Sequence, residues 1–208
     1  MSADSELARL LEHPAIWRGR SAARPQVIPT GFGALDECLP GRGWPRTGLM
    51  EILVPRFGIG ELYLLLPALA ALTRRPVARW CVWVTPPLEP FAPALVAHEM
   101  TLERVLVVRA PMAMWAFEQS LGSGACDAAM AWARHPRARE IRRVQLAAER
   151  GRALGILFRS QRAARESSPA ILRVALEPSA NGVRVTLLKS RGGARGSVEI
   201  AWHTVVGS

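Results

Sequence analysis

The sequence predicts an α/β fold with a mostly parallel central sheet, flanked by helices and extended by antiparallel strands towards the carboxyl terminus. Two observations carry this prediction. From about residue 28 to residue 160, short apolar runs typical of buried strands alternate with stretches at helical spacing. After that, two strand-like runs flank Ser179-Ala180-Asn181-Gly182, which is a hairpin turn signal. Helical crossovers give parallel strands, whereas a hairpin gives antiparallel ones.

Each element follows from its local pattern. Residues 28–41 read as a strand end, a glycine turn and a short helix with Leu35 and Leu39 inward. The apolar runs predict strands over 48–54, 79–85, 104–110, 125–132 and 154–160. The helical spacing predicts helices over 62–73, 113–121 and 137–153. The antiparallel strands are expected over 171–178, 182–190 and 197–206.

The chain is expected to form one core preceded by an arm. Residues 1–27 combine a short helix, with Leu7, Leu10 and Leu11 on one face, and an irregular basic stretch. Residues 28–208 form the core. Most of the tryptophans are expected to pack in the core, whereas Trp17 and Trp44 lie beside arginines in irregular segments and are candidates for anchoring a partner.

The chain is strongly basic, with a formal net charge of +10 and a pI near 11.3. Of its 27 basic residues, 26 are arginines and Lys189 is the one lysine. This favours polyanions or acidic protein surfaces as partners. GC-rich coding also enriches arginine together with alanine, glycine and proline, so the charge alone does not identify a partner.

Composition argues against several classes of protein. Cys38, Cys81 and Cys126 are far apart, which fits neither a zinc site nor a disulfide framework, and no metal or cofactor is expected. The amino-terminal residues carry acids and arginine within their apolar stretch, unlike a signal peptide. The longest apolar run, 62–72, is too short to cross a bilayer. We therefore expect a cytoplasmic protein that does not bind membranes.

A glycine-rich turn between the strand at 48–54 and the next helix is the setting in which backbone N–H groups bind phosphate. A working phosphate loop ends in Gly-Lys-Ser/Thr, but this chain has Gly60, Glu61 and Leu62 there. A carboxylate would repel phosphate, and leucine offers no oxygen to magnesium. The degenerate loop comprises Pro55, Arg56, Phe57, Gly58, Ile59, Gly60, Glu61 and Leu62. An ordinary tight turn is the alternative, because short glycine-rich matches are weak.

The flanking segments resemble the recombinase RecA from about residue 28 to the end. IPTGFGALDECLPGRGWPRTGLMEILVPRFGIG is similar to the recombinase stretch that leads into the Walker A strand. In this register Pro86 and Pro87 stand where the resemblance implies a catalytic glutamate, and Trp132 stands where it implies the magnesium-linked aspartate. FRSQR, 158–162, resembles the strand whose polar end senses the γ-phosphate. The resemblance implies a RecA-like core that lacks both the ATPase residues and the recombinase carboxyl-terminal domain.

WPRTGLMEILVPRFGIGELYLLLPALA is similar to the translesion DNA synthesis protein family ImuA. Membership implies a non-catalytic accessory role in SOS-induced mutagenic repair, near the nucleoid. The partners it implies are ImuB and, through ImuB, an error-prone replicative-type DNA polymerase, with RecA and single-stranded DNA as further candidates. LLKSRGG, with Lys189 and Arg191, resembles the recombinase segment that reaches a neighbouring subunit's ATP. These two residues are candidates for contacting RecA in trans.

Single-stranded DNA binding has its own candidates among the arginines, whose phosphate contacts would make affinity fall steeply with salt. A solvated helix face is the alternative explanation of such a charge run. The candidates are Arg137, Arg139, Arg142, Arg143, Arg159, Arg162 and Arg165. A weak ATPase and an SOS cell-division regulator similar to SulA are the remaining functional alternatives.

Overall fold

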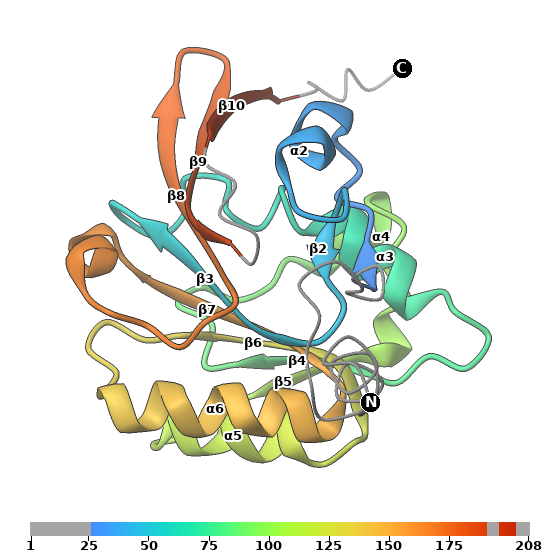
Figure 1. Ribbon diagram of the computed structural model, residues 1–208. Coiled ribbons are helices and arrows are strands. Elements are labelled where there is room, and N and C mark those ends of the chain that lie inside the picture. Colours follow the sequence, from blue (N-terminus) through green and yellow to red (C-terminus); the bar gives the residue numbers. More distant parts are fainter. Residues whose placement is uncertain (1–25, 191–195, 203–208) are drawn as a thin grey trace, which may run out of the picture.

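The core of the molecule is an eight-stranded sheet, seen in the computed structural model of Figure 1, which describes residues 26–190 and 196–202. The strands follow one another in space as β10-β9-β8-β3-β7-β6-β4-β5. Their bounds are β3 (Gly48–Val54), β4 (Trp80–Val84), β5 (Val105–Val108), β6 (Cys126–Trp132), β7 (Leu154–Ser160), β8 (Leu172–Ser179), β9 (Gly182–Ser190) and β10 (Gly196–Ala201).

The pairing of these strands confirms the predicted α/β class. All pairs from β8 through β3, β7, β6 and β4 to β5 are parallel. The β8–β9 and β9–β10 pairs are antiparallel, as the hairpin signal predicts. The sheet is therefore mostly parallel with an antiparallel extension. Both β3 and β7 are buried along nearly their whole length, which explains why their sequences are continuous apolar runs rather than alternating ones.

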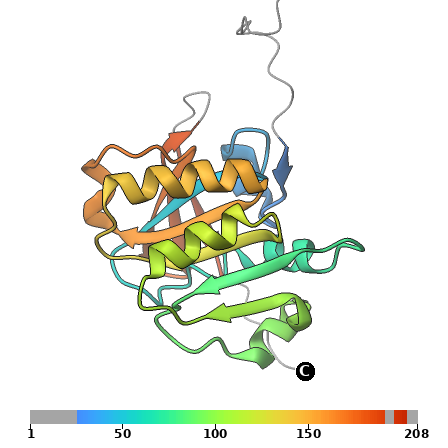
Figure 2. The same cartoon turned by 90° about the horizontal axis from the view of Figure 1, so that it is seen from below.

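Helices cover both faces of the sheet (Figures 1 and 2). One face packs against α5 (Ala113–Gly122) and α6 (Ala138–Gly151). The other packs against α2 (Gly33–Cys38), α3 (Leu66–Thr73) and α4 (Ala92–Ala97), and α2 also contacts β10. Two short 3₁₀ helices, η1 (Leu102–Arg104) and η2 (Gln161–Arg165), and a small ribbon of β1 (Val27–Ile28) with β2 (Trp44–Pro45) complete the described chain.

The predicted boundaries agree with the structure where the apolar pattern is strong and differ where prolines or turns intervene. The strands at 48–54 and 154–160 are confirmed to the residue. The helix expected from residue 62 begins instead at Leu66, because residues 61–65 form a turn and Pro67 sits in the first helical turn. Helix α4 was not predicted, since its short sequence contains Pro93. The last strand ends at Ala201, and residues 203–206 lie outside the described chain.

The predicted division into arm and core is only partly visible, because most of the arm, residues 1–25, lies outside the described chain. Within the described ranges, no helix is both long and apolar enough to cross a membrane.

Candidate functional site

Four segments that the sequence singled out meet at one edge of the sheet, because the parallel strands that precede them all end there. The glycine-rich turn follows β3, Pro86 and Pro87 lie beyond β4, Trp132 ends β6, and Gln161 begins η2 after β7. In open sheets of this type, ligands bind at the carboxyl ends of the strands. This edge is therefore the candidate site.

The carboxylate of Glu61 occupies the backbone N–H groups of the glycine-rich turn. The N–H of Gly58 donates to both carboxylate oxygens, at 2.8 and 3.0 Å, and the N–H of Ile59 donates to Oε2 at 2.9 Å. Glu61 is itself buried. Gly58 and Gly60 adopt positive φ angles of 83° and 95°, which turn successive N–H groups towards one point. The turn thus holds an anion supplied by its own chain.

Aromatic side chains cover this turn. The ring of Trp202, just after β10, lies so close to Gly60 that a Cβ there would be 2.6 Å from it. Trp202 also packs edge-on against Tyr63, with ring centroids 4.8 Å apart, and Tyr63 contacts Phe32 at 5.6 Å. The Gly60 end of the turn is therefore covered by a residue distant in sequence, which its own local pattern could not reveal, whereas Gly58 stays exposed.

The other residues that the sequence singled out at this edge are not acids. Pro87 is exposed, and Leu62 is half-buried in the apolar core. Trp132 is buried and stacks on Phe158 with ring centroids 4.8 Å apart and planes 15° from parallel. Its indole at the end of β6 therefore packs in the apolar core.

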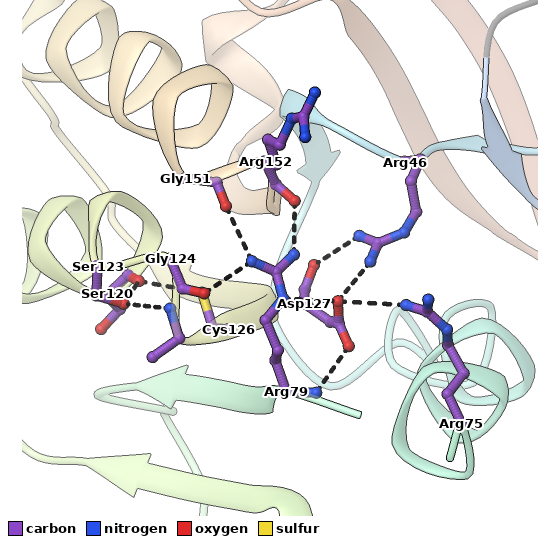
Figure 3. A network of polar contacts seen from close by, with 11 residues as sticks. Arg46, Arg75, Arg79, Ser120, Ser123, Gly124, Cys126, Asp127, Gly151 and Arg152 are labelled. Atoms are coloured by element: carbon purple, nitrogen blue, oxygen red, sulfur yellow. Dashed lines mark hydrogen bonds and ion pairs between the residues drawn. The ribbon is translucent and has the colours of Figure 1, made fainter. Parts of the chain in front are cut away.

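At the opposite edge of the sheet, Asp127 forms a buried charge cluster with three arginines (Figure 3). Its carboxylate accepts from the backbone N–H of Arg79 at 2.9 Å and from Arg79 Nε at 3.1 Å. Arg46 pairs closely with the same carboxylate, and Arg75 lies 3.4 Å away. Asp127 is near the amino end of β6, five residues and about 17 Å from Trp132, so it cannot take the role of an acid at the carboxyl edge.

Hydrogen bonding keeps Asp127 ionised. Burial by itself would raise the pKa of its carboxyl group, but the hydrogen bonds from Arg79 and Arg46 outweigh burial and lower the pKa overall. The same Arg79 guanidinium donates to the carbonyls of Gly124, Gly151 and Arg152, at 2.8 to 3.0 Å (Figure 3). The cluster therefore fastens the ends of α5 and α6 to the start of β6.

A second buried cluster lies on the central strands and corrects one candidate. Arg159, proposed as a DNA contact, is only 2% exposed and pairs with Glu51 at 3.1 Å and with Glu166 at 2.6 Å. Glu51 also pairs with Arg173 at 2.6 Å. Arg159 is therefore a structural residue under η2 and does not belong to the exposed arginines. The signal for both clusters was in the sequence, since Glu51, Arg159, Arg173 and Asp127 interrupt apolar strands.

The remaining candidate arginines are exposed but are not all together. Arg137 precedes α6, and Arg139, Arg142 and Arg143 lie on that helix. Within the described chain, only Arg143 of these four pairs with a carboxylate, that of Glu118 on α5, with Nε 3.1 Å and a terminal nitrogen 2.7 Å from its two oxygens. Arg162 and Arg165 belong to η2, at the same carboxyl edge as Arg137.

Lys189 lies on β9, where its Nζ donates to the carbonyl of Ser168 at 2.7 Å. Arg191 and Trp17 lie outside the described residues. Trp44 is fully buried rather than available as an anchor. No group of three or more potential metal ligands occurs in residues 26–190 and 196–202.

Comparison with known proteins adds little beyond these observations. No protein-family model matches the sequence, and no curated protein matches it. Among solved structures, the crystal structure of SulA from Pseudomonas aeruginosa is similar over 53% of this chain and 97% of that one, with 23% identity and a TM-score of 0.46. A likeness at this level assigns neither a fold family nor a function to the chain.

Proposed function

We propose that this chain is a non-catalytic adaptor of SOS-induced translesion DNA synthesis, similar to ImuA, built on a RecA-like core whose nucleotide site no longer works. It binds ImuB, reaches the error-prone polymerase through ImuB, and also engages RecA or single-stranded DNA. The sequence resemblance supplies the identity of the partners. The observation that carries the loss of catalysis is the Glu61 carboxylate bound inside the glycine-rich turn.

Nucleotide binding at this turn would require an unfavourable exchange. A phosphate needs the same two N–H groups that Glu61 occupies, so the carboxylate would have to leave its buried position. It would then stand beside the phosphate as a like charge. No lysine offsets this repulsion, because Lys189 is the only lysine of the chain. Lys189 lies on β9, and its Nζ donates to the carbonyl of Ser168.

The position of the turn supports the RecA-like reading. It follows β3, which lies between β7 and β8 near the middle of the sheet, while the next strand along the chain, β4, lies beyond β7 and β6. The chain therefore continues to one side of β3 and later returns to the other. Such a switch point is where doubly wound α/β sheets bind nucleotides.

An exposed apolar surface around the edge strand β5 supports an adaptor role. Both Leu106 and Val107 of β5 are exposed, and so are Leu88 and Phe91, which precede α4. Phe91 is 70% exposed, and an apolar surface of this kind commonly marks a protein interface. Val107 lies on the same face of the sheet as Trp83 and α4, whereas Leu106 lies on the opposite face, so we assign the contact with ImuB to the surface formed by Leu88, Phe91 and Val107.

Co-purification tests this function directly. The full chain is expected to capture ImuB, and Phe91→Asp is expected to abolish capture, whereas Leu146→Asp on α6, another exposed apolar position, should leave it intact. Calorimetry with ATP and magnesium should show no binding. If the chain captures neither ImuB nor RecA, the adaptor function is wrong. Binding of ATP in the low micromolar range would favour the weak ATPase instead.

Single-stranded DNA binding is the second candidate function, favoured by the exposed Arg137, Arg139 and Arg142, which have no carboxylate partner in the described chain. When the logarithm of the association constant is plotted against the logarithm of the salt concentration, the slope should be about −0.7 for each phosphate contacted. An affinity that does not change with salt would remove this candidate.

A further inference from the structure

A groove between α5 and α6 opens at the carboxyl edge of the sheet. It is lined by the segment before and at the start of α5, 111–115, by the segment that joins β6 to α6, 132–137, and by side chains of both helices. Its volume is about 610 Å³, within the range of small-ligand sites. The glycine-rich turn is not part of it.

The wall of this α5–α6 groove carries an aromatic ring that is not used in the core. Trp115, in the first turn of α5, is 52% exposed, and Met112 beside it is 64% exposed. Trp132 and Phe158, by contrast, are buried and stacked on each other. A half-exposed indole on a helix offers a flat face for another ring, at little cost in conformational entropy.

The lining of the groove carries two arginines and two glutamates, and further exposed arginines lie beside it. Arg137 and Arg143 line it, and the exposed Arg139 lies two residues after Arg137, outside the lining. Of the acids nearby, Glu118 pairs with Arg143, while Glu140 accepts the backbone N–H of Arg137 at 2.7 Å and keeps its negative charge; in the described chain neither acid forms an ion pair with the guanidinium of Arg137 or Arg139. Arg137 and Arg139 thus remain for an external anion.

We propose that the α5–α6 groove binds single-stranded DNA, with one unpaired base stacked on Trp115 and the flanking phosphates on Arg137 and Arg139. This inference rests on the second proposed function and names its site. An exposed aromatic ring with arginines beside it is the arrangement that sequence-independent single-strand binders use. Duplex DNA does not fit as well, because its bases are stacked inside and offer no free face to the indole.

The test compares an oligothymidine with an abasic oligomer of the same length and charge, using the full chain. Stacking of one base should make the oligothymidine bind roughly fivefold to a hundredfold tighter than the abasic strand. Trp115→Ala should abolish this difference and Trp115→Phe should retain part of it. Trp80→Ala, which removes a tryptophan exposed to 41% at the far edge, is the matched control and should change nothing.

The arginines are tested separately by salt dependence. Replacing Arg137 and Arg139 with alanine should reduce the salt slope by about 0.7 for each lost phosphate contact, for both oligomers. If affinity depends on salt but Trp115→Ala behaves like Trp80→Ala, the α5–α6 groove is not the binding site, and only DNA binding by the exposed arginines stands. If neither oligomer binds, or if affinity is independent of salt, single-stranded DNA binding itself fails and the groove with it. Equal binding of both oligomers by the unaltered chain would also overturn the stacking site.

Discussion

Replacing Glu61 with alanine removes the anion that fills the glycine-rich turn. The carboxylate accepts the N–H groups of Gly58 and Ile59, and its residue is only 4% exposed. A hydrogen bond to a charged group contributes about 1.5 to 3 kcal/mol to stability. Because Gly58 is exposed and water can replace part of this interaction, we expect Glu61→Ala to lower the free energy of unfolding by about 2 kcal/mol.

Urea unfolding measures this change, and thermal melting provides an independent reading. For a chain of this size, 2 kcal/mol corresponds to about 4–8 °C in Tm. Glu61→Gln keeps one acceptor oxygen but loses the charge, so about half of the effect is expected. Glu103→Ala, at an exposed glutamate, is the matched control and should stay within about 0.5 kcal/mol.

The emptied turn should also gain affinity for external anions. Inorganic phosphate at about ten times its Kd would add about 1.4 kcal/mol of stability to Glu61→Ala through binding to the folded state. The unaltered chain should show only the general stabilisation that phosphate salts give any protein. Equal phosphate effects on both proteins, or a Glu61→Ala variant as stable as the Glu103→Ala control, would refute the conclusion that Glu61 fills an anion site.

Three further outcomes are expected. Because the folded-state pKa of Asp127 is lowered, its contribution to stability is present above about pH 4 and is lost as the pH falls through the folded pKa. Asp127→Asn should therefore cost about 2–3 kcal/mol at pH 7 and flatten the loss of urea stability in acid; an unchanged acid profile would contradict this. Burial raises the pKa of Cys81 to about 12 and of Cys126 to about 11. An aromatic disulfide reagent at pH 8 should therefore label only the half-buried Cys38 of the native chain, and labelling of two cysteines would contradict this. Gly151→Ala would place a Cβ 1.8 Å from a backbone oxygen of α5 and should cost more than about 3 kcal/mol by urea unfolding, whereas Gly33→Ala, with open space around it, should be neutral or stabilising.

Much of the fold followed from the sequence because its signals are local. The runs at 48–54 and 154–160 are mostly apolar and shorter than a usual helix, which indicates buried strands, and both are strands to the residue. The turn signal Ser179-Ala180-Asn181-Gly182 predicted the hairpin in the same way, and Ala180 and Asn181 form its turn. The turn before α3 and the helix α4 were missed because prolines and short lengths leave no clear periodicity.

For the candidate site as well, the sequence determined some features and the tertiary structure determined the others. The sequence by itself determined that Glu61 stands in a glycine-rich turn at the position where a working phosphate loop has lysine, since residue identity and spacing are enough for that. It also determined the excess of arginine.

Only the tertiary structure decided what these residues do. It turned the two N–H groups towards Glu61, placed Trp202 over Gly60, and buried Arg159 against Glu51. It also brought Trp115 beside Arg137. Except for the contact within the turn itself, these contacts join residues far apart in sequence, and they arise from strand order and burial, which no local pattern encodes.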